Sequence, residues 1–348
     1  MEKRRATCFH AAVVAAASIM SLSAAWAHHS VSAYFDTSQV IEVQGELTDV
    51  RWQNPHVGFS IDVRGENGEV TEWQISSTSV SHLGRLGLTG DMFTLGEIVT
   101  FAGSPSRRSI PALQATNMLR AGGEEIALNT TGRRHWSSGV EEYLRVTPAD
   151  VGARDDGEVF ERSLFRVWST PTRTADRDPI WEDSYPLTAE ARAAQAAWDP
   201  ITDNPVILCV GKGMPSIMNP PYPMELIDRG DVIVYRQEEF DSVRTIYMNP
   251  ATTPAPEPSN MGHSVGRWEG ETLVVDTILS TWPYFDGQGI PISSAAEYEE
   301  RFTLSDDGKR LDYTVLITDM TTFTEPVLLD RFWLWVPGVQ VEPYECTP

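Results

Sequence analysis

Hydrophobic and polar positions alternate along residues 57–63, which read Val-Gly-Phe-Ser-Ile-Asp-Val. A period of two is typical of a strand with one buried face. Two neighbouring features extend the pattern: Gly45 allows a bend in the extended stretch at 40–52, and Asn67-Gly68 is a strong hairpin turn. In chain order, the predicted elements are strands at 40–52, 57–63 and 69–75, a short helix at 79–86, and strands at 97–103 and 112–119.

Three strands, a helix and two further strands follow one another in the order of an OB-fold, a small Greek-key barrel. We therefore predict an OB-like β-module over residues 28–129. OB-folds often bind single-stranded nucleic acid through basic grooves and stacking aromatic side chains. The fold alone does not assign that function, which has to be argued from the residues of a site.

Short extended patterns separated by turns also fill the second half of the chain. About eight strands in about 140 residues predict a lipocalin-like (calycin-type) antiparallel barrel, wide enough for a small ligand. We place this domain at residues 164–348, after a linker at 130–163, and expect one helix near its start, at 186–198. The fold class is therefore all-β. The predicted strands of the second barrel lie at 224–228, 231–240, 243–248, 263–268, 272–279, 297–304, 311–318 and 327–335.

Residues 1–27 have the three parts of a secretory signal peptide. Three basic residues at 3–5 precede an apolar, alanine-rich run at 11–25, and Ala25-Trp26-Ala27 fits the cleavage pattern of signal peptidase. The apolar run is short for a membrane span of roughly 20 residues. We expect a periplasmic or secreted protein with no span in the mature chain. An uncleaved anchor and cleavage at another position are the alternatives.

The chain is acidic, with a formal net charge of −22 over 348 residues. A surface of this sign repels phosphate backbones and anionic lipid headgroups. Nucleic acid is therefore not an expected partner, even for an OB-like module. Acidity by itself names no ligand.

Cysteine usage also fits an exported protein. Cys8 lies in the leader, so the mature chain keeps Cys209 and Cys346. Two cysteines in an oxidising compartment most simply pair with each other, and a loop of this length gives a stabilisation of roughly 5 kcal/mol in the chain-entropy model. Two separate thiols are the alternative. Metal binding by this pair is less favoured, because neither cysteine has C-x-x-C spacing.

Cleavage after Ala27 would make His28 the first residue of the mature chain. A terminal α-amine and the imidazole of the same residue can chelate one metal ion, and nitrogen ligands of this kind suit Cu(II). The arrangement resembles the histidine brace of copper proteins such as lytic polysaccharide monooxygenases. The predicted metal ligands are His28, His29 and His56, with Asp36 as an orienting partner. The alternative is that these histidines are ordinary polar surface residues.

Two stretches resemble known but uncharacterised sequences. The segment HHSVSAYFD, followed by VRWQNPHVGFSIDV, resembles a bacterial family of exported proteins of unknown function, over about residues 28–120. The motif MGHSVGRWEG resembles part of a C-terminal region of uncharacterised exported bacterial proteins, over about residues 164–346. The resemblance implies an architecture and carries over no established activity.

A second candidate site surrounds His263, which could act as a general base with Asp276, Tyr247 or Glu225. Ser264 follows directly, yet no G-x-S-x-G elbow frames it as a nucleophile. The structural alternative is that Gly262 and Gly266 allow a bend where the strand enters the sheet. Whether the protein is an enzyme stays open at this stage.

The leading hypothesis is an exported binding protein. The OB-like module would capture a metal ion, with copper as the cofactor, and the second barrel would hold a small apolar ligand. The rival is an enzyme with an acid/base site around His263 in the second barrel. Aromatic side chains that could line an apolar pocket, or simply fill the core, are Trp268, Trp282, Tyr284, Phe285, Phe302, Trp333 and Trp335.

Overall fold

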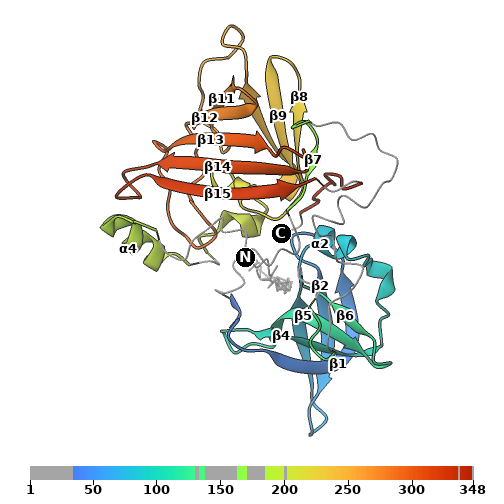
Figure 1. Ribbon diagram of the computed structural model, residues 1–348. Helices are drawn as coiled ribbons and strands as arrows, with labels where there is room; N and C mark the ends of the chain where they lie inside the picture. The colour runs from blue at the N-terminus through green and yellow to red at the C-terminus, as the bar shows by residue number, and fades with distance from the viewer. Residues whose placement is uncertain are drawn as a thin grey trace, which may run out of the picture.

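The computed structural model describes residues 34–129, 133–137, 163–170, 185–199, 202–335 and 338–346. These residues form two β-barrels, one following the other along the chain (Figure 1). The predicted all-β class, with a small barrel followed by a larger one, is confirmed. The predicted signal peptide at 1–27 and most of the predicted linker at 130–163 lie outside the described residues. In the described part of the chain, every helix is too short or too polar to cross a bilayer.

The first barrel has the strand order of an OB-fold. Going round the barrel, β1 pairs with β2, β2 with β3, β3 with β5 in parallel, β5 with β4, and β4 with β1 again. The sheet therefore closes on five strands, and β6 adds to the edge of β5. Its elements are β1 (Ile41–Arg51), β2 (Gly58–Arg64), β3 (Val70–Ser76), α2 (Val80–Arg85), the 3₁₀ turn η1 (Gly90–Met92), β4 (Ile98–Pro105), β5 (Ala112–Arg120) and β6 (Glu125–Ala127).

Sequence alternation explains why this sheet curls around a core. Val57, Phe59 and Ile61 are all fully buried, as the period of two predicts. Gly45 is required at its position in β1, because a Cβ there would lie 2.7 Å from the carbonyl oxygen of Asp62 on the neighbouring strand. The strand can therefore cross its neighbour closely where the barrel bends.

The second barrel is one sheet of nine strands arranged in sequence order. Its two edge strands meet, because Ser169 and Leu334 exchange backbone hydrogen bonds of 2.9 and 2.8 Å. The elements are β7 (Val167–Trp168), α4 (Ala189–Ala197), η3 (Pro205–Leu208), η4 (Ser216–Met218), β8 (Met224–Asp228), β9 (Val232–Gln237), η5 (Glu239–Asp241), β10 (Ser242–Tyr247), β11 (His263–Glu269), β12 (Thr272–Ile278), β13 (Glu297–Leu304), β14 (Arg310–Thr318) and β15 (Val327–Leu334).

One strand pair departs from a purely antiparallel meander. β10 and β11 run parallel, with Ile246 opposite Ser264. A parallel pair needs a long crossover, and residues 248–262 supply it between the two strands. The remaining neighbours in this sheet are antiparallel.

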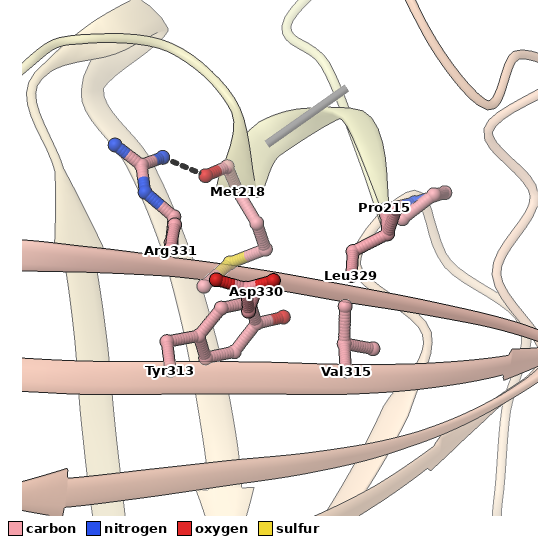
Figure 2. A pocket seen from close by; sticks show the side chains of 7 residues that line it. All are labelled: Pro215, Met218, Tyr313, Val315, Leu329, Asp330 and Arg331. Carbon is pink, nitrogen blue, oxygen red and sulfur yellow. Dashed lines mark hydrogen bonds between the residues drawn. The ribbon is translucent and has the colours of Figure 1, made fainter. Parts of the chain in front are cut away.

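Side chains fill the interior of the second barrel. A void of about 10 Å³ lies between η4 and strands β14 and β15, beside Met218, Tyr313 and Leu329 (Figure 2). A volume of this size is about the minimum that holds one water molecule. Four of the aromatic side chains suggested by the sequence, Phe285, Phe302, Trp282 and Trp333, are buried, whereas Trp268 is exposed. The void is therefore far too small for an organic ligand.

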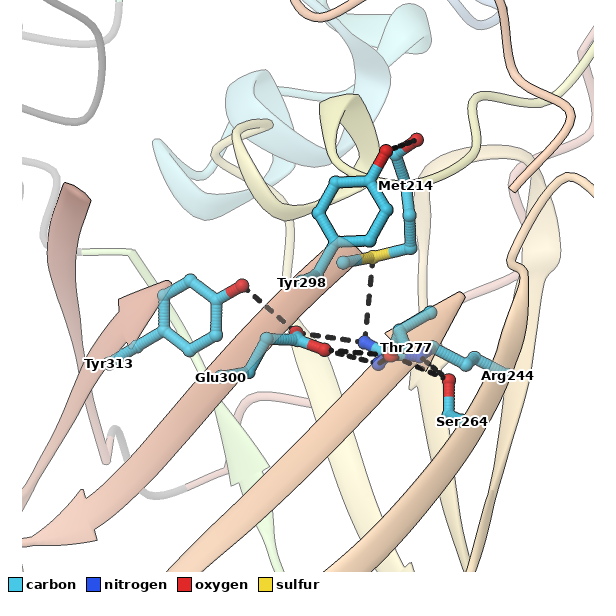
Figure 3. Close-up of polar contacts among 7 residues, drawn as sticks. All are labelled: Met214, Arg244, Ser264, Thr277, Tyr298, Glu300 and Tyr313. Carbon is cyan, nitrogen blue, oxygen red and sulfur yellow. Dashed lines mark hydrogen bonds and ion pairs between the residues drawn. The ribbon is translucent and has the colours of Figure 1, made fainter. Parts of the chain in front are cut away.

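A buried ion pair crosses the middle of this barrel (Figure 3). The guanidinium of Arg244, which is 2% exposed, pairs with both carboxylate oxygens of Glu300, which is 0% exposed. Arg244 also donates to the hydroxyls of Ser264, at 2.8 Å, and Thr277, at 2.5 Å. The hydroxyl of Tyr313 donates to Glu300 over 2.9 Å. The pair is surrounded by donors and acceptors that compensate for its burial.

The C-terminal segment 338–346 ties the two barrels together. Cys209 and Cys346 form a disulfide, with their Cα atoms 5.9 Å apart, which confirms the predicted pairing. Cys346 also forms a backbone bridge with Asn54 in the loop after β1. The segment therefore lies against the first barrel and is covalently bound to the second.

Candidate functional site

A cleft of about 310 Å³ lies at the junction of the two barrels. In Figure 1, α2 marks the end of the first barrel that faces the second. One wall comes from the loop after β1 and the start of α2. The other comes from the second barrel and from Tyr344 of the C-terminal segment. The walls carry several titratable side chains that could bind a ligand or transfer protons: His56, His82, Lys212, Tyr222, Glu239 and Asp286.

Two histidines stand on the wall of the first barrel. His56 donates from Nδ1 to the carbonyl oxygen of Ser77 over 2.9 Å, and this oxygen also accepts from the side chain of Gln114 over 3.1 Å. His82 is 5% exposed, and its Nδ1 lies 2.7 Å from the hydroxyl oxygen of Ser79. These hydrogen bonds fix the orientation of both rings.

Ser79 is the residue that places His82 in the cleft. It precedes α2 and accepts a hydrogen bond from the backbone N–H of His82, which makes it the N-cap of the helix. The ring of His82 then meets the ring of Tyr222 edge-on, with centroids 5.4 Å apart. The contact joins a side chain of the first barrel to one of the second.

A buried carboxylate stands on the opposite wall. Glu239 is 4% exposed, and its Oε1 accepts from the ammonium of Lys212 over 2.8 Å. Burial raises the pKa of Glu239, while Lys212 acts in the opposite direction. Among the described residues, Oε2 of Glu239 has no hydrogen-bond partner. Such an acceptor is costly unless something donates to it.

Asp286 is a second buried carboxylate, 7% exposed, on the rim of the same cleft. Its Oδ1 accepts the backbone N–H groups of Gln288 and Ile290, at 2.9 and 3.1 Å. Burial raises the pKa of Asp286 in spite of these two hydrogen bonds. The carboxylate is therefore held in place by its loop and disfavoured when charged.

Two tyrosines close the inner end of the cleft. The hydroxyl oxygens of Tyr222 and Tyr344 are 3.4 Å apart, and their rings meet edge-on with centroids separated by 5.4 Å. Burial raises the pKa of both phenols, so both stay neutral at physiological pH. Both side chains line the cleft, and most of their surface is buried against neighbouring rings.

The structure locates one of the three predicted metal ligands. His56 lines the cleft, whereas His28 and His29 lie outside the described residues. Asp36, the predicted orienting partner, accepts hydrogen bonds from Ser38 and Gln39 in its own turn. Within the described ranges, no three or more His, Cys, Asp or Glu side chains are arranged to hold a metal ion. The copper site stays a prediction.

The first described residues, Tyr34 and Phe35, nevertheless lie at the same end of the first barrel as His56. Tyr34 and Phe35 pack against Ala112 at the start of β5. Two residues further along this strand, Gln114 donates to the same Ser77 carbonyl that binds His56. The first described residues and His56 are thus linked through one short stretch of β5.

The residues of the alternative acid/base site lie on the outer face of the second barrel. Ser264 points inward to Arg244, so its neighbour His263 points outward, where its ring stacks on Tyr247 with centroids 5.2 Å apart. Asp276 is on the same face and forms an ion pair with Arg267. His263 is therefore next to Tyr247, one of its three suggested partners, while Asp276 is bound to an arginine. An enzymatic role stays untested.

Sequence reasoning missed most of the cleft. His82, Lys212, Glu239 and Asp286 belong to no recognisable motif. One signal was available, because the predicted Cys209–Cys346 pairing already brings residues close to 212 and 344 toward one point. Charge and burial at that point could not be read from the sequence.

Comparison with known proteins adds one finding. A family of unknown function (DUF6152) matches residues 15–112, a range that includes β1 to β4 and the start of β5 of the first barrel. The match agrees with the expected similarity to an uncharacterised family. No curated protein matches the chain.

Proposed function

We propose that this chain is an exported binding protein that captures Cu(II) at its processed N-terminus. Cleavage after Ala27 would leave His28 with a free α-amine, and His29 or His56 would supply a further imidazole. The observation that carries the proposal is the link between Tyr34, β5 and His56 at one end of the first barrel.

Chain length limits how far the processed N-terminus can reach. His28 precedes Tyr34 by six residues, which can span at most about 20 Å when fully extended. His56 donates from Nδ1 to a carbonyl oxygen, so the lone pair of a neutral ring is on Nε2. This nitrogen would be the metal ligand, and the Ser77 carbonyl would hold the ring in position.

Charge also supports capture of a cation. The protein carries a net charge of −22, and a field of this sign raises the local concentration of positive ions. Soft thiolate ligands are not offered to the metal, because Cys209 and Cys346 are joined in the disulfide. A nitrogen site for Cu(II) fits these conditions better than a thiolate site for Cu(I).

The proposal is tested by titrating Cu(II) into the processed protein. Isothermal calorimetry and electron paramagnetic resonance monitor the binding. We expect one tight site, weakened at least tenfold by His28→Ala, by His56→Ala and by one extra residue before His28. His135→Ala is the matched control, because the ring of His135 pairs with Glu42 on the first barrel. An affinity that His28→Ala and the added residue leave unchanged would refute the proposal.

The small ligand of our hypothesis fits the cleft better than the interior of the second barrel. The void inside that barrel has about 10 Å³, whereas the cleft has about 310 Å³. Binding pockets for small molecules begin at about 300 Å³. We therefore place ligand binding at the junction of the barrels.

A further inference from the structure

We infer that the cleft between the two barrels binds a small organic cation, whose ammonium group is held by Glu239 and whose body lies against Tyr222 and Tyr344. The inference specifies the ligand of the cleft and rests on the placement of ligand binding there. It does not depend on copper at the N-terminus.

Glu239 carries a buried acceptor that the described residues do not satisfy. One carboxylate oxygen is bound by Lys212, and the other, Oε2, has no hydrogen-bond partner among the described residues although it is buried. An ammonium group has three donors and no acceptor, so it can complete this carboxylate without leaving a new unsatisfied acceptor. Hydrogen bonds between charged groups are also the stronger ones.

The charged side chains of the cleft also favour a positive ligand. Lys212 is the cation on its walls, and Glu239 and Asp286 are two carboxylates. When both carboxylates are ionised, they outnumber Lys212 by one charge, so a positive ligand is favoured over a neutral or negative one. Such a ligand also opposes the burial that raises the pKa of both carboxyl groups.

The walls of the cleft also carry aromatic and apolar surface. Tyr222 and Tyr344 are among the lining residues, and aromatic rings attract cations. Pro55, Pro220 and Pro221 add apolar surface. At roughly 30 Å³ for each water-sized group, the volume suits a ligand of about ten non-hydrogen atoms.

Asp286 supports the same inference from the side of stability. A buried carboxylate with a raised pKa makes the folded state less stable when it is ionised. The side-chain oxygen of an asparagine could accept the same backbone N–H groups of Gln288 and Ile290. These hydrogen bonds therefore do not require an aspartate at this position. A cation bound in the cleft that Asp286 lines would offset the cost of its negative charge.

Tyramine is a suitable probe, because it has ten non-hydrogen atoms, one ammonium group and one aromatic ring. We would titrate it into the full chain by calorimetry at pH 7.5 with EDTA present, so that no metal contributes. 4-Ethylphenol, which lacks the amine, is the uncharged comparison. We expect saturable binding of tyramine at one site, and at least tenfold weaker binding of 4-ethylphenol.

Variants locate the site. Glu239→Gln and Asp286→Asn should each weaken tyramine binding at least fivefold, whereas Glu297→Gln, at the exposed first residue of β13, should leave the affinity unchanged. Near-ultraviolet circular dichroism checks that each variant is folded. If Glu239→Gln does not fold, amide chemical shifts of the wild type decide, with changes expected at residues 212, 222 and 239.

The inference is overturned if tyramine does not saturate, if 4-ethylphenol binds as tightly, or if the shift changes fall away from the cleft. Equal affinity of folded Glu239→Gln and wild type also overturns it. Because copper is excluded from these titrations, failure here leaves the copper proposal standing. Conversely, unchanged copper affinity of His28→Ala leaves the cleft inference standing.

Discussion

Asn54 donates a hydrogen bond from its side-chain nitrogen to the backbone carbonyl oxygen of Tyr344, with 2.7 Å between the two atoms and 290 residues between them in sequence. The oxygen of the same amide accepts from the backbone N–H of Val80, at the start of α2, over 3.1 Å. Asn54 is buried, so both bonds are shielded from water. One side chain therefore joins a loop, a helix start and the C-terminal segment.

Asn54→Ala should lower the free energy of unfolding by about 1–3 kcal/mol, because it leaves the carbonyl of Tyr344 and the N–H of Val80 without this partner. Urea unfolding followed by circular dichroism measures the change. Asn67→Ala, in the exposed turn between β2 and β3, is the control and should stay within about 0.5 kcal/mol. Equal stability of the two variants would contradict a joint at Asn54.

Replacing both Cys209 and Cys346 by alanine should lower the free energy of unfolding by up to about 5 kcal/mol, since the bond closes a span of 137 residues. The reduced wild type should behave like the double variant. Urea midpoints with and without reductant provide the comparison. Midpoints that do not move would show that the hydrogen bonds of the C-terminal segment suffice without the bond.

Glu300→Gln should destabilise the second barrel by about 3–5 kcal/mol, because Arg244 would be left buried without its counter-charge. The double variant Arg244→Met with Glu300→Leu should lose less than the single one, since neither charge is then buried. Arg301→Met removes surface pairs with Glu269 and Glu299 and should change stability by less than about 1 kcal/mol. Thermal unfolding ranks the stabilities of the three variants. A double variant that is less stable than Glu300→Gln would count against this explanation.

Asp286→Asn should raise the melting temperature at pH 7 and lose this advantage near pH 3. The pKa of Asp286 is raised in the folded state, so its stabilising contribution is complete only below the unfolded pKa of about 3.9 and is lost as pH rises through the folded pKa. Asparagine removes this penalty at neutral pH. Scanning calorimetry of variant and wild type at both pH values checks the sign.

Asp319→Asn should show the opposite pH dependence. Hydrogen bonds from Ser293, Thr321 and Thr322 lower the pKa of Asp319, although burial opposes them. Its stabilisation is therefore present above the unfolded pKa and is lost as pH falls through the folded pKa. We expect the variant to be less stable than the wild type at pH 7 and to approach it at low pH. The same calorimetric comparison applies, and parallel curves for both aspartates would refute the argument.

Local patterns were enough to predict both barrels. Alternation at residues 57–63 and the Asn67-Gly68 turn depend on neighbours in sequence, and the structure has strands β2 and β3 there. Thr188 caps α4 with its hydroxyl for the same local reason. The parallel pairing of β10 with β11 was not predicted, because it depends on how residues 248–262 cross the barrel.

The cleft could not be predicted in this way. Its walls combine loops near residues 55, 80, 212, 239, 286 and 344, which meet only after both barrels have formed. Burial raises the pKa of Glu239, and no sequence pattern around Glu239 indicates that it is buried. The sequence suggested His56 as a metal ligand with His28 and His29, and the structure adds the cleft residues around it.

The attachment of Tyr344 and Cys346 to the loop at Asn54 sets an order of assembly. Ribosomes make the first barrel long before they reach these two residues, and domains generally fold as units. The loop at Asn54 in the first barrel therefore lacks these partners until the C-terminal segment has been made and reaches it. Conditions that delay the oxidation of Cys209 and Cys346 would lengthen this interval, during which the incomplete junction is open to proteases and to non-native contacts.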